Sequence, residues 1–291
     1  LSAKGFKEKL KGNSLESKIY NVVFTELSKT ETREEIIREF PKSGIHRRNN
    51  GYAIDAILEN ELFSKSEAPI NLSKLLCGSE GTLAFTTDIT LTLDELPPEH
   101  NMLVAAHFLS IQESLEAVVV AMKHNLYTCE LMDKKILDCT KNNREQLKNR
   151  FFVEGDPEAI LMLEVASDEP DKTEALAKKL IADLTSHNFG YAYPVLEGKN
   201  IEKANTLRKA GLGLLGNIVG DRKAVACIED TAVEVSDLPA YISEFTAMMK
   251  AYGQEAVYYA HAGAGEIHLR PILNLKKKAD VVLFRKIASP C

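Results

Sequence analysis

Two histidines and a glutamate near the C-terminal end of the chain stand at a spacing that suits metal binding. Residues 258–270 read YYAHAGAGEIHLR, in which His261 and His268 flank a glycine-rich turn. If Ala264-Gly265 is a two-residue turn, His261 faces His268 directly across a β-hairpin, with Cβ atoms about 4.5–5.5 Å apart. Glu266 then shares the face of His268, because side chains alternate along a strand. Two imidazoles and a carboxylate on one face suit a divalent metal such as zinc, although this spacing more often belongs to two structural histidines that are hydrogen-bonded.

A second candidate for chemistry is Arg208, which precedes a Gly-x-Gly-x-x-Gly run at residues 211–216. A dinucleotide fingerprint follows a strand and opens a helix. Here the preceding residues 200–210 are predicted to be helical, so we interpret the glycines as a mobile loop. A guanidinium at the end of that helix suits a bidentate grip on a carboxylate, and the alternative is a solvated helix arginine.

A glycine turn with two hydroxyls, Gly-Ser-Glu-Gly-Thr at residues 78–82, leads into an alternating segment at 85–93 that is predicted to be a strand. Glycine lets a ligand approach the backbone closely, because no Cβ stands in the way. Upstream, Arg47-Arg48-Asn49-Asn50 leads to Gly51 and Tyr52. Two arginines suit a phosphate, although a charged loop is more often simply solvated.

The elements that must position these residues fall into two regions. Helical periodicity at residues 15–27 and 34–40, with strands at 75–77 and 85–93, precedes Pro97-Pro98, the best candidate boundary. Strands and helices alternate beyond it, which predicts an α+β fold with helices on one face of a sheet. The predicted strands are 102–109, 129–132, 160–166, 190–195, 225–233, 257–261 and 266–272, and the helices are 111–123, 172–187, 201–210 and 238–252.

The bulk composition excludes several classes of protein. The chain has 291 residues, of which 45% are hydrophobic and 27% charged, and its net charge is −6. This is typical of a soluble globular protein with length for about two domains, and it does not indicate a basic face for nucleic acid. No apolar run reaches the roughly 20 residues that span a membrane. The five cysteines form no Cys-x-x-Cys pair, which argues against a metal–thiolate site.

The order Gly-Ser-Glu-Gly-Thr-Leu at 78–83 and His-x-Gly-x-Gly-x-x-His at 261–268 resemble signatures of the FAD-linked oxidases, in the vanillyl-alcohol oxidase superfamily. That group includes glycolate oxidase flavoprotein subunits, D-lactate dehydrogenases and D-2-hydroxyglutarate dehydrogenases. The resemblance implies that residues 1–97 are the C-terminal part of an FAD-binding domain. Residues 98–291 would then be a truncated substrate or cap domain, ferredoxin-like and α+β, with an antiparallel sheet.

The resemblance also implies roles for individual residues. Arg208 corresponds to the arginine that binds the substrate carboxylate, and His261 and His268 correspond to metal ligands. Ala264 stands where the family usually has Asp, and Glu266 where it has Asn, which leaves the identity of the metal open. The residues implied to contact FAD are Gly51, Tyr52, Gly78, Ser79, Glu80, Gly81 and Thr82.

The implied parent enzyme oxidises a D-2-hydroxy acid, whether D-lactate, glycolate or D-2-hydroxyglutarate, to the 2-oxo acid. FAD accepts the hydride and passes electrons to an acceptor such as iron–sulfur clusters or quinone. The resemblance is compatible with a homodimer and with a cytoplasmic location, including the inner face of a membrane. The alternative is a non-catalytic metal-binding or interaction module that kept the fold.

We also expect this chain to be an internal fragment that holds no FAD and has no activity by itself. In the family, a glycine-rich loop in the N-terminal half grips the pyrophosphate of FAD. A later Gly-Glu-His-Gly stretch supplies the catalytic histidine and the last metal ligand. Neither stretch lies within residues 1–291.

Overall fold

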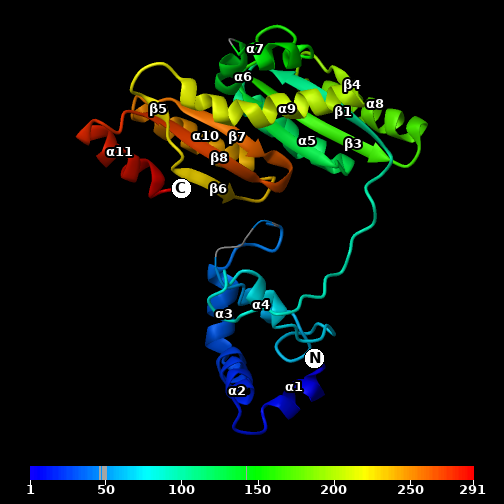
Figure 1. Ribbon diagram of the computed structural model, residues 1–291, viewed down its shortest axis with the longest axis vertical. Coiled ribbons are helices and arrows are strands. Elements are labelled where there is room, and N and C mark those ends of the chain that lie inside the picture. The colour runs from blue at the N-terminus through cyan, green and yellow to red at the C-terminus, as the bar shows by residue number, and fades with distance from the viewer. Residues whose placement is uncertain (46, 48–50, 142) are drawn as a thin grey trace. The chain divides into compact units, whose positions relative to one another are not determined.

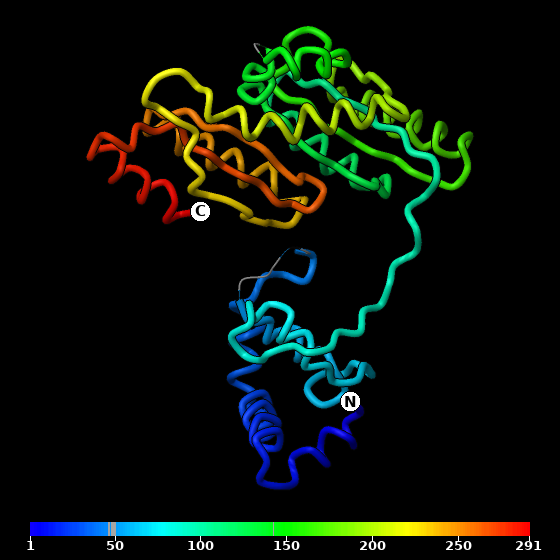
Figure 2. Tube along the Cα trace, in the orientation of Figure 1, coloured from blue at the N-terminus to red at the C-terminus, as the bar shows by residue number. Residues whose placement is uncertain are grey.

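The computed structural model describes residues 1–45, 47, 51–141 and 143–291. The chain divides into two compact units, Leu1–Asp94 and Glu95–Cys291, which we call unit 1 and unit 2 (Figures 1 and 2). Arg48, Asn49 and Asn50 of the predicted phosphate-contacting loop lie outside the described residues. None of the helices formed by the described residues is long and apolar enough to cross a membrane.

Unit 1 is helical over the part of the chain that the structure describes. Its α-helices are α1 (Ala3–Lys9), α2 (Leu15–Ser28), α3 (Thr30–Glu39) and α4 (Ser73–Cys77), with a 3-10 helix at Asp55–Ile57. The hydroxyl of Ser14 caps α2 by accepting a hydrogen bond from the backbone N–H of Ser17 at 3.1 Å. A small core of Leu27, Ile36, Ile57 and Leu58 joins α2, α3 and the 3-10 helix.

The strands predicted in unit 1 do not form. Residues 75–77 lie in α4, and residues 85–93 run without regular structure. A strand needs a hydrogen-bonded neighbour, and no strand is present among the described residues of unit 1 to supply one. The apolar side chains of Phe85, Ile89, Leu91 and Leu93 are consequently exposed, Phe85 to 93%.

Unit 2 is built on one antiparallel sheet. Its strands are β1 (His100–Phe108), β2 (Thr128–Asp133), β3 (Ala159–Ser167), β4 (Val195–Glu197), β5 (Lys223–Ala224), β6 (Ile228–Ala232), β7 (Ala256–His261) and β8 (Glu266–Leu273). Its helices are α5 (Ile111–Ala121), α6 (Lys134–Lys141), α7 (Arg144–Leu147), α8 (Pro170–Ser186), α9 (Lys199–Leu214), α10 (Leu238–Ala251) and α11 (Lys278–Ala288). The strand order is β4-β1-β3-β2-β7-β8-β5, and β6 also pairs with β8.

The first half of unit 2 has the ferredoxin-like arrangement that the resemblance implies. The chain follows β1-α5-β2, then β3-α8-β4, and these strands lie in the order β4-β1-β3-β2. The α+β class and the antiparallel sheet are therefore confirmed. The hairpin of β7 and β8 extends the same sheet beyond β2, through pairs such as Leu131 with Ala260.

Helices cover both faces of this sheet, whereas we expected them on one face only (Figure 1). Val104 and Leu161 point into a core that also contains residues of α5, α8 and α10. Leu103 and Met162 point the other way, into a second core with residues of α6 and α9. The expectation was wrong because near-continuous apolar strands such as β3 are buried on both faces. We call the second side the α6–α9 face.

Helix α9 continues through the glycines that we interpreted as a mobile loop. Gly211 and Gly213 both lie inside it, so that interpretation was wrong. Packing explains why residue 211 is a glycine, because a Cβ built on Gly211 would overlap the side chain of Ile136 in α6. The absence of a side chain thus lets α9 and α6 approach closely on the same face of the sheet.

The side chain of Asp133, at the end of β2, is hydrogen-bonded to α6 and to β7. Its carboxylate accepts hydrogen bonds from the backbone N–H of Ile136 at the start of α6 and of Tyr258 in β7, both at 2.9 Å. Burial raises the pKa of this carboxyl from 3.8 to about 7, although both hydrogen bonds act to lower it. The folded chain therefore holds the Asp133 proton more tightly than the unfolded chain does.

That difference predicts a pH dependence of stability. The contribution of Asp133 to stability is full below the unfolded pKa of 3.8 and is lost as pH rises through about 7. Asp133→Asn cannot ionise, so its unfolding free energy, measured by urea titration, should fall less between about pH 5 and pH 8, by on the order of 2 kcal/mol. Asp156→Asn is the control, because the pKa of this exposed carboxyl is lowered to about 2. An Asp133→Asn variant with the wild-type pH profile would contradict this account.

Candidate metal and substrate site

The hairpin of β7 and β8 has a longer turn than the sequence predicts. His261 pairs with Glu266, and Tyr259 pairs with His268, so His261 and His268 are not directly opposed. Residues 262–264 form a 3-10 turn, and Gly265 closes it with φ of +68°. The predicted pairing was therefore wrong by two residues. A shift of two residues leaves each side chain on its face, so the predicted sharing of one face is confirmed.

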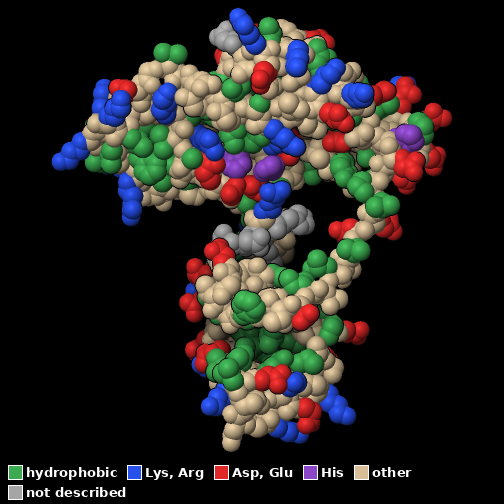
Figure 3. Space-filling view, in the orientation of Figure 1, with side chains coloured by type: hydrophobic (Ala, Val, Ile, Leu, Met, Phe, Trp, Pro, Cys, Tyr) green, Lys and Arg blue, Asp and Glu red, His purple; other side chains and the backbone are tan. Residues whose placement is uncertain are grey.

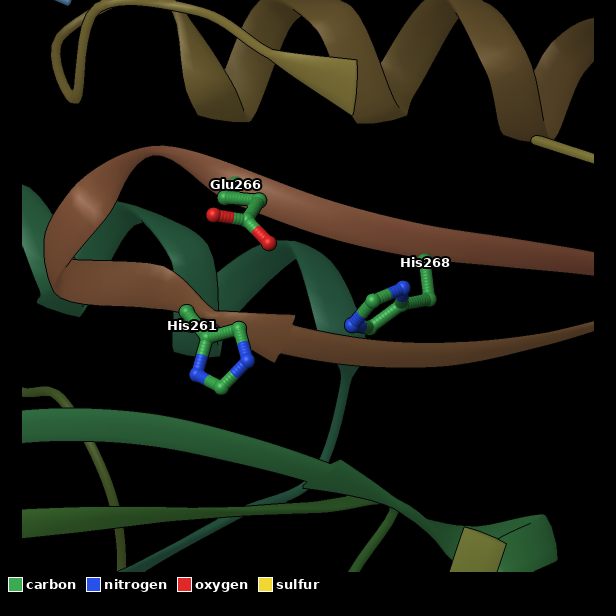
Figure 4. Close-up of side chains that lie close together, drawn as sticks. All are labelled: His261, Glu266 and His268. Carbon is green, nitrogen blue, oxygen red and sulfur yellow. The ribbon is translucent and has the colours of Figure 1, made fainter. Parts of the chain in front are cut away.

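His261, Glu266 and His268 point toward one another from the two strands (Figure 4). One ligand atom from each lies within 4.8 Å of the other two, and the imidazole centroids are 5.8 Å apart. Glu266 and His268 are buried and His261 is half-buried. All three lie on the α6–α9 face, because the residues that alternate with them, Ala260 in β7 and Ile267 and Leu269 in β8, point into the opposite core.

The arrangement fits a divalent metal. Two ligands of one zinc ion, each about 2.1 Å from it, lie no more than about 4.2 Å apart. Small rotations of His261, Glu266 and His268 bring atoms that are within 4.8 Å of one another into that range. Two nitrogens and one oxygen form a donor set typical of zinc sites in which a further position stays open for substrate or water.

Two carboxylates from neighbouring strands flank the histidines. Glu130 of β2 lies 3.0 Å from Nδ1 of His261 and accepts a hydrogen bond there. Glu229 of β6 lies 3.1 Å from Nδ1 of His268, within ion-pair distance but without hydrogen-bond alignment. Glu229 also accepts two hydrogen bonds from Arg270, at 2.8 and 3.0 Å. Both carboxylates therefore approach a histidine from the Nδ1 side.

Arg208 lies beside these residues, inside α9 rather than at its end. Its guanidinium donates to Glu130 through Nη2, which is also 3.5 Å from Nδ1 of His261. The guanidinium carbon stands 4.5 Å from the centroid of the Tyr259 ring, a cation–π contact. Burial raises the pKa of the Tyr259 phenol, which keeps the ring neutral. Arg208 is buried, and its Nε has no hydrogen-bond partner among the described residues.

The site remains accessible from one side of unit 2. The space-filling view shows histidine side chains next to each other at the surface, with acidic and basic side chains around them (Figure 3). Helices α6 and α9 pack over Leu103, Met162 and their neighbours on this face. The histidines belong to the adjoining part of the face, on β7 and β8, where His261 keeps 29% of its side chain exposed.

The residues implied to contact FAD come together within unit 1. The Tyr52 hydroxyl lies 2.7 Å from that of Thr82, and a Cβ on Gly78 would stand 2.6 Å from the carbonyl oxygen of Gly51. Gly51 and Gly81 have positive φ, and no atom of the described residues fills the space where a Cβ would stand in either, which fits backbone approached by a ligand.

Two more of these residues are accounted for by the turn itself. The Ser79 hydroxyl is buried and donates to the carbonyl of Leu76 at 2.9 Å, so it serves the turn. Glu80 is exposed and has φ of +50°.

The role of Glu130 does not follow from the sequence, which predicts only a strand at residues 129–132. Its partner His261 is 131 residues away along the chain. One signal was present, because Glu130 is the one charged residue in the predicted strand 129–132, whose other residues are apolar. Such a residue is rarely buried unless it is paired.

One family model matches most of unit 2. Residues 97–289 match the family model "FAD linked oxidases, C-terminal domain". The D-2-hydroxyglutarate dehydrogenase of Haemophilus influenzae is 30% identical over 268 residues, which cover 89% of this chain and 25% of that protein. The enzyme of the same name from Escherichia coli is 28% identical, over 96% of this chain and 27% of that protein.

A shorter relative is similar to much of the same region. The D-lactate dehydrogenase of Archaeoglobus fulgidus is 28% identical over 226 residues, which cover 76% of this chain and 46% of that protein. The chain therefore spans about a quarter of the length of the two D-2-hydroxyglutarate dehydrogenases and about half of the D-lactate dehydrogenase.

The tight turn predicts that Gly265→Ala disrupts the histidine hairpin. Gly265 has φ of +68°, and a Cβ there would overlap the carbonyl oxygen of Val233. We expect the free energy of unfolding, measured by urea titration, to fall by about 1–3 kcal/mol. Gly213→Ala is the matched control, since it lies in α9 with open space around it. Equal losses in the two variants would show that the turn is not the cause.

Proposed function

The chain belongs to the FAD linked oxidases, and we propose that it supplies substrate-binding and metal-binding residues to a flavin-dependent dehydrogenase of D-2-hydroxy acids. The observation that carries this proposal is the convergence of Arg208 with His261 and His268 on one face of unit 2. The names of the relatives support the substrate class, since they are dehydrogenases of D-2-hydroxyglutarate and of D-lactate.

His261 and His268 hold a divalent metal in this proposal, with Glu266 as the adjacent carboxylate. Such an ion acts as a Lewis acid that lowers the pKa of a substrate hydroxyl. The residues of the chain then fix where the hydroxyl lies. Both imidazoles come from paired, rigid strands, and Glu130 and Glu229 limit how far they turn. Sites on paired strands hold geometry more closely than sites on loops.

Arg208 binds the carboxylate of the hydroxy acid in this proposal. Its planar guanidinium matches a carboxylate, and its buried Nε–H has no partner among the described residues. A buried donor without a partner is uncommon and costs stability, so a ligand that accepts from it gains affinity. Stacking on Tyr259 and the hydrogen bond to Glu130 keep the guanidinium in place before substrate arrives.

Gly51, Tyr52 and Gly78–Thr82 contribute to the flavin-binding wall in this proposal. FAD supplies the redox chemistry by accepting a hydride. The open backbone at Gly51 and Gly81 admits the cofactor closely, and the contact between Tyr52 and Thr82 keeps the two turns together. A bound flavin would pass its electrons on to an acceptor such as iron–sulfur clusters or quinone.

The metal site predicts that the chain binds one Zn²⁺ or Co²⁺ through the histidine hairpin. We expect His261→Ala and His268→Ala each to weaken metal binding at least tenfold, because each variant removes a ligand. Loss of a residue that only supports a ligand already costs about 10- to 100-fold in metal affinity. Calorimetry and Co²⁺ absorption measure the affinity. His187→Ala is the control, since His187 is exposed at the end of α8. Binding that survives in both hairpin variants would place the metal elsewhere.

The substrate role predicts a kinetic effect of Arg208→Ala in a full-length dehydrogenase that contains this chain. KM should rise and kcat should fall, with kcat/KM lower by about 10- to 100-fold, because the arginine orients the reacting carbon as well as binding it. Arg208→Lys should rescue poorly, since lysine lacks the planar fork. Lys209→Ala, an exposed neighbour on α9, is the control. Wild-type kinetics with D-lactate, glycolate and D-2-hydroxyglutarate in the alanine variant would refute the role.

A further inference from the structure

We propose that Glu130 is a positioning residue that holds His261 in the tautomer protonated at Nδ1 and at the same time fixes Arg208. This inference rests on the proposed function, because it joins the proposed metal site to the proposed carboxylate site through one side chain. In this proposal Glu130 connects the two sites but neither binds the metal nor contacts the substrate.

The position of Glu130 follows from the register of the sheet. Leu131 pairs with Ala260 and Met132 with Tyr259, so the next residues in this antiparallel register, Glu130 and His261, stand opposite each other. His261 in turn pairs with Glu266 on the far side. Glu130, His261 and Glu266 thus form a row across β2, β7 and β8 on the α6–α9 face. Side chains that are direct neighbours in such a row are close enough to interact.

The chemistry of the contact selects one tautomer of His261. Nδ1 of His261 lies 3.0 Å from Glu130, which only accepts hydrogen bonds, and 3.5 Å from Nη2 of Arg208, which only donates them. The shorter contact favours a proton on Nδ1. In the neutral ring Nε2 then keeps its lone pair, which is the form that a metal binds. Carboxylates that accept from the second nitrogen of a ligating histidine orient the ring and raise its basicity.

The second contact of Glu130 extends this control to Arg208. The two donors, Nη2 of Arg208 and Nδ1 of His261, converge on one carboxylate that is only 19% exposed. Nη2 of Arg208 donates to Oε2, and Nδ1 of His261 lies 3.0 Å from each of the two oxygens. An amide offers both donors a single accepting oxygen, because its other end is itself a donor. Hydrogen bonds to a charged acceptor are also stronger than those to a neutral one, so the carboxylate holds the imidazole and the guanidinium together more firmly than an amide would.

Glu130→Gln in residues 1–291 tests the proposal without reference to catalysis. The tautomer is measured from imidazole ¹⁵N–¹H spectra of the metal-free chain at about pH 8, where histidine is ordinarily neutral. The signal of His261 is identified by its loss in His261→Ala. We expect the wild type to carry the proton on Nδ1 of His261. In Glu130→Gln we expect a shift toward the Nε2 form, faster exchange of the Arg208 Nε–H, and Zn²⁺ binding at least about tenfold weaker.

Glu164→Gln is the matched control. Glu164 is also a buried strand carboxylate, but it accepts from Asn101 at 2.6 Å and Thr128 at 3.2 Å instead of from a histidine. It should leave the His261 tautomer and the Zn²⁺ affinity unchanged. If His261 of the wild type is protonated at Nε2, the proposal is wrong, even if Glu130→Gln fails to fold. A folded Glu130→Gln variant with wild-type spectra would also overturn it. Failure of the wild type to bind Zn²⁺ would instead refute the proposed metal function, while the tautomer still decides the role of Glu130.

Discussion

The pairing of β7 with β2 on one side and β8 on the other is the constraint on which the site depends. It brings residues that are 131 positions apart in the chain, Glu130 and His261, into contact. Because side chains alternate, the same pairing sends Leu131, Ala260 and Ile267 into the α5–α8–α10 core and leaves the neighbouring polar residues of the site on the other face. The stability of that core therefore fixes the geometry of the histidines.

Charge balance is the second organising factor. Each of the carboxylates Glu130 and Glu229 is shared between one guanidinium and one imidazole. Charges that are partly buried are tolerated when they are paired and hydrogen-bonded, and breaking such a pair leaves the remaining charge without compensation. The arrangement therefore resists substitution at any of its members.

Much of unit 2 could be predicted from the sequence, because its elements follow local patterns. Alternation and helical periodicity located β1, α5, β3, α8 and α10, and the even spacing of Glu266 and His268 placed them on one face. The turn before Gly265 could not be predicted in the same way, since its register depends on a backbone contact with Val233, far along the chain. Nor could the contact of Gly211 with Ile136, which requires knowing that α9 crosses α6. In unit 1 the strand pattern at 85–93 was correctly recognised as alternating, but a strand forms only where a partner is available.

The extended segment at residues 85–93 affects how the chain behaves in concentrated solution. Ile89, Leu91 and Leu93 are all exposed and alternate with threonines, and the segment contains no proline. Short stretches of this kind readily pair with identical copies of themselves, edge to edge. Asp88 and Asp94 stand at the two ends of the alternating part, where like charges oppose the stacking of copies. Self-association through this stretch should consequently increase with protein concentration and with ionic strength, as salt screens the two aspartates.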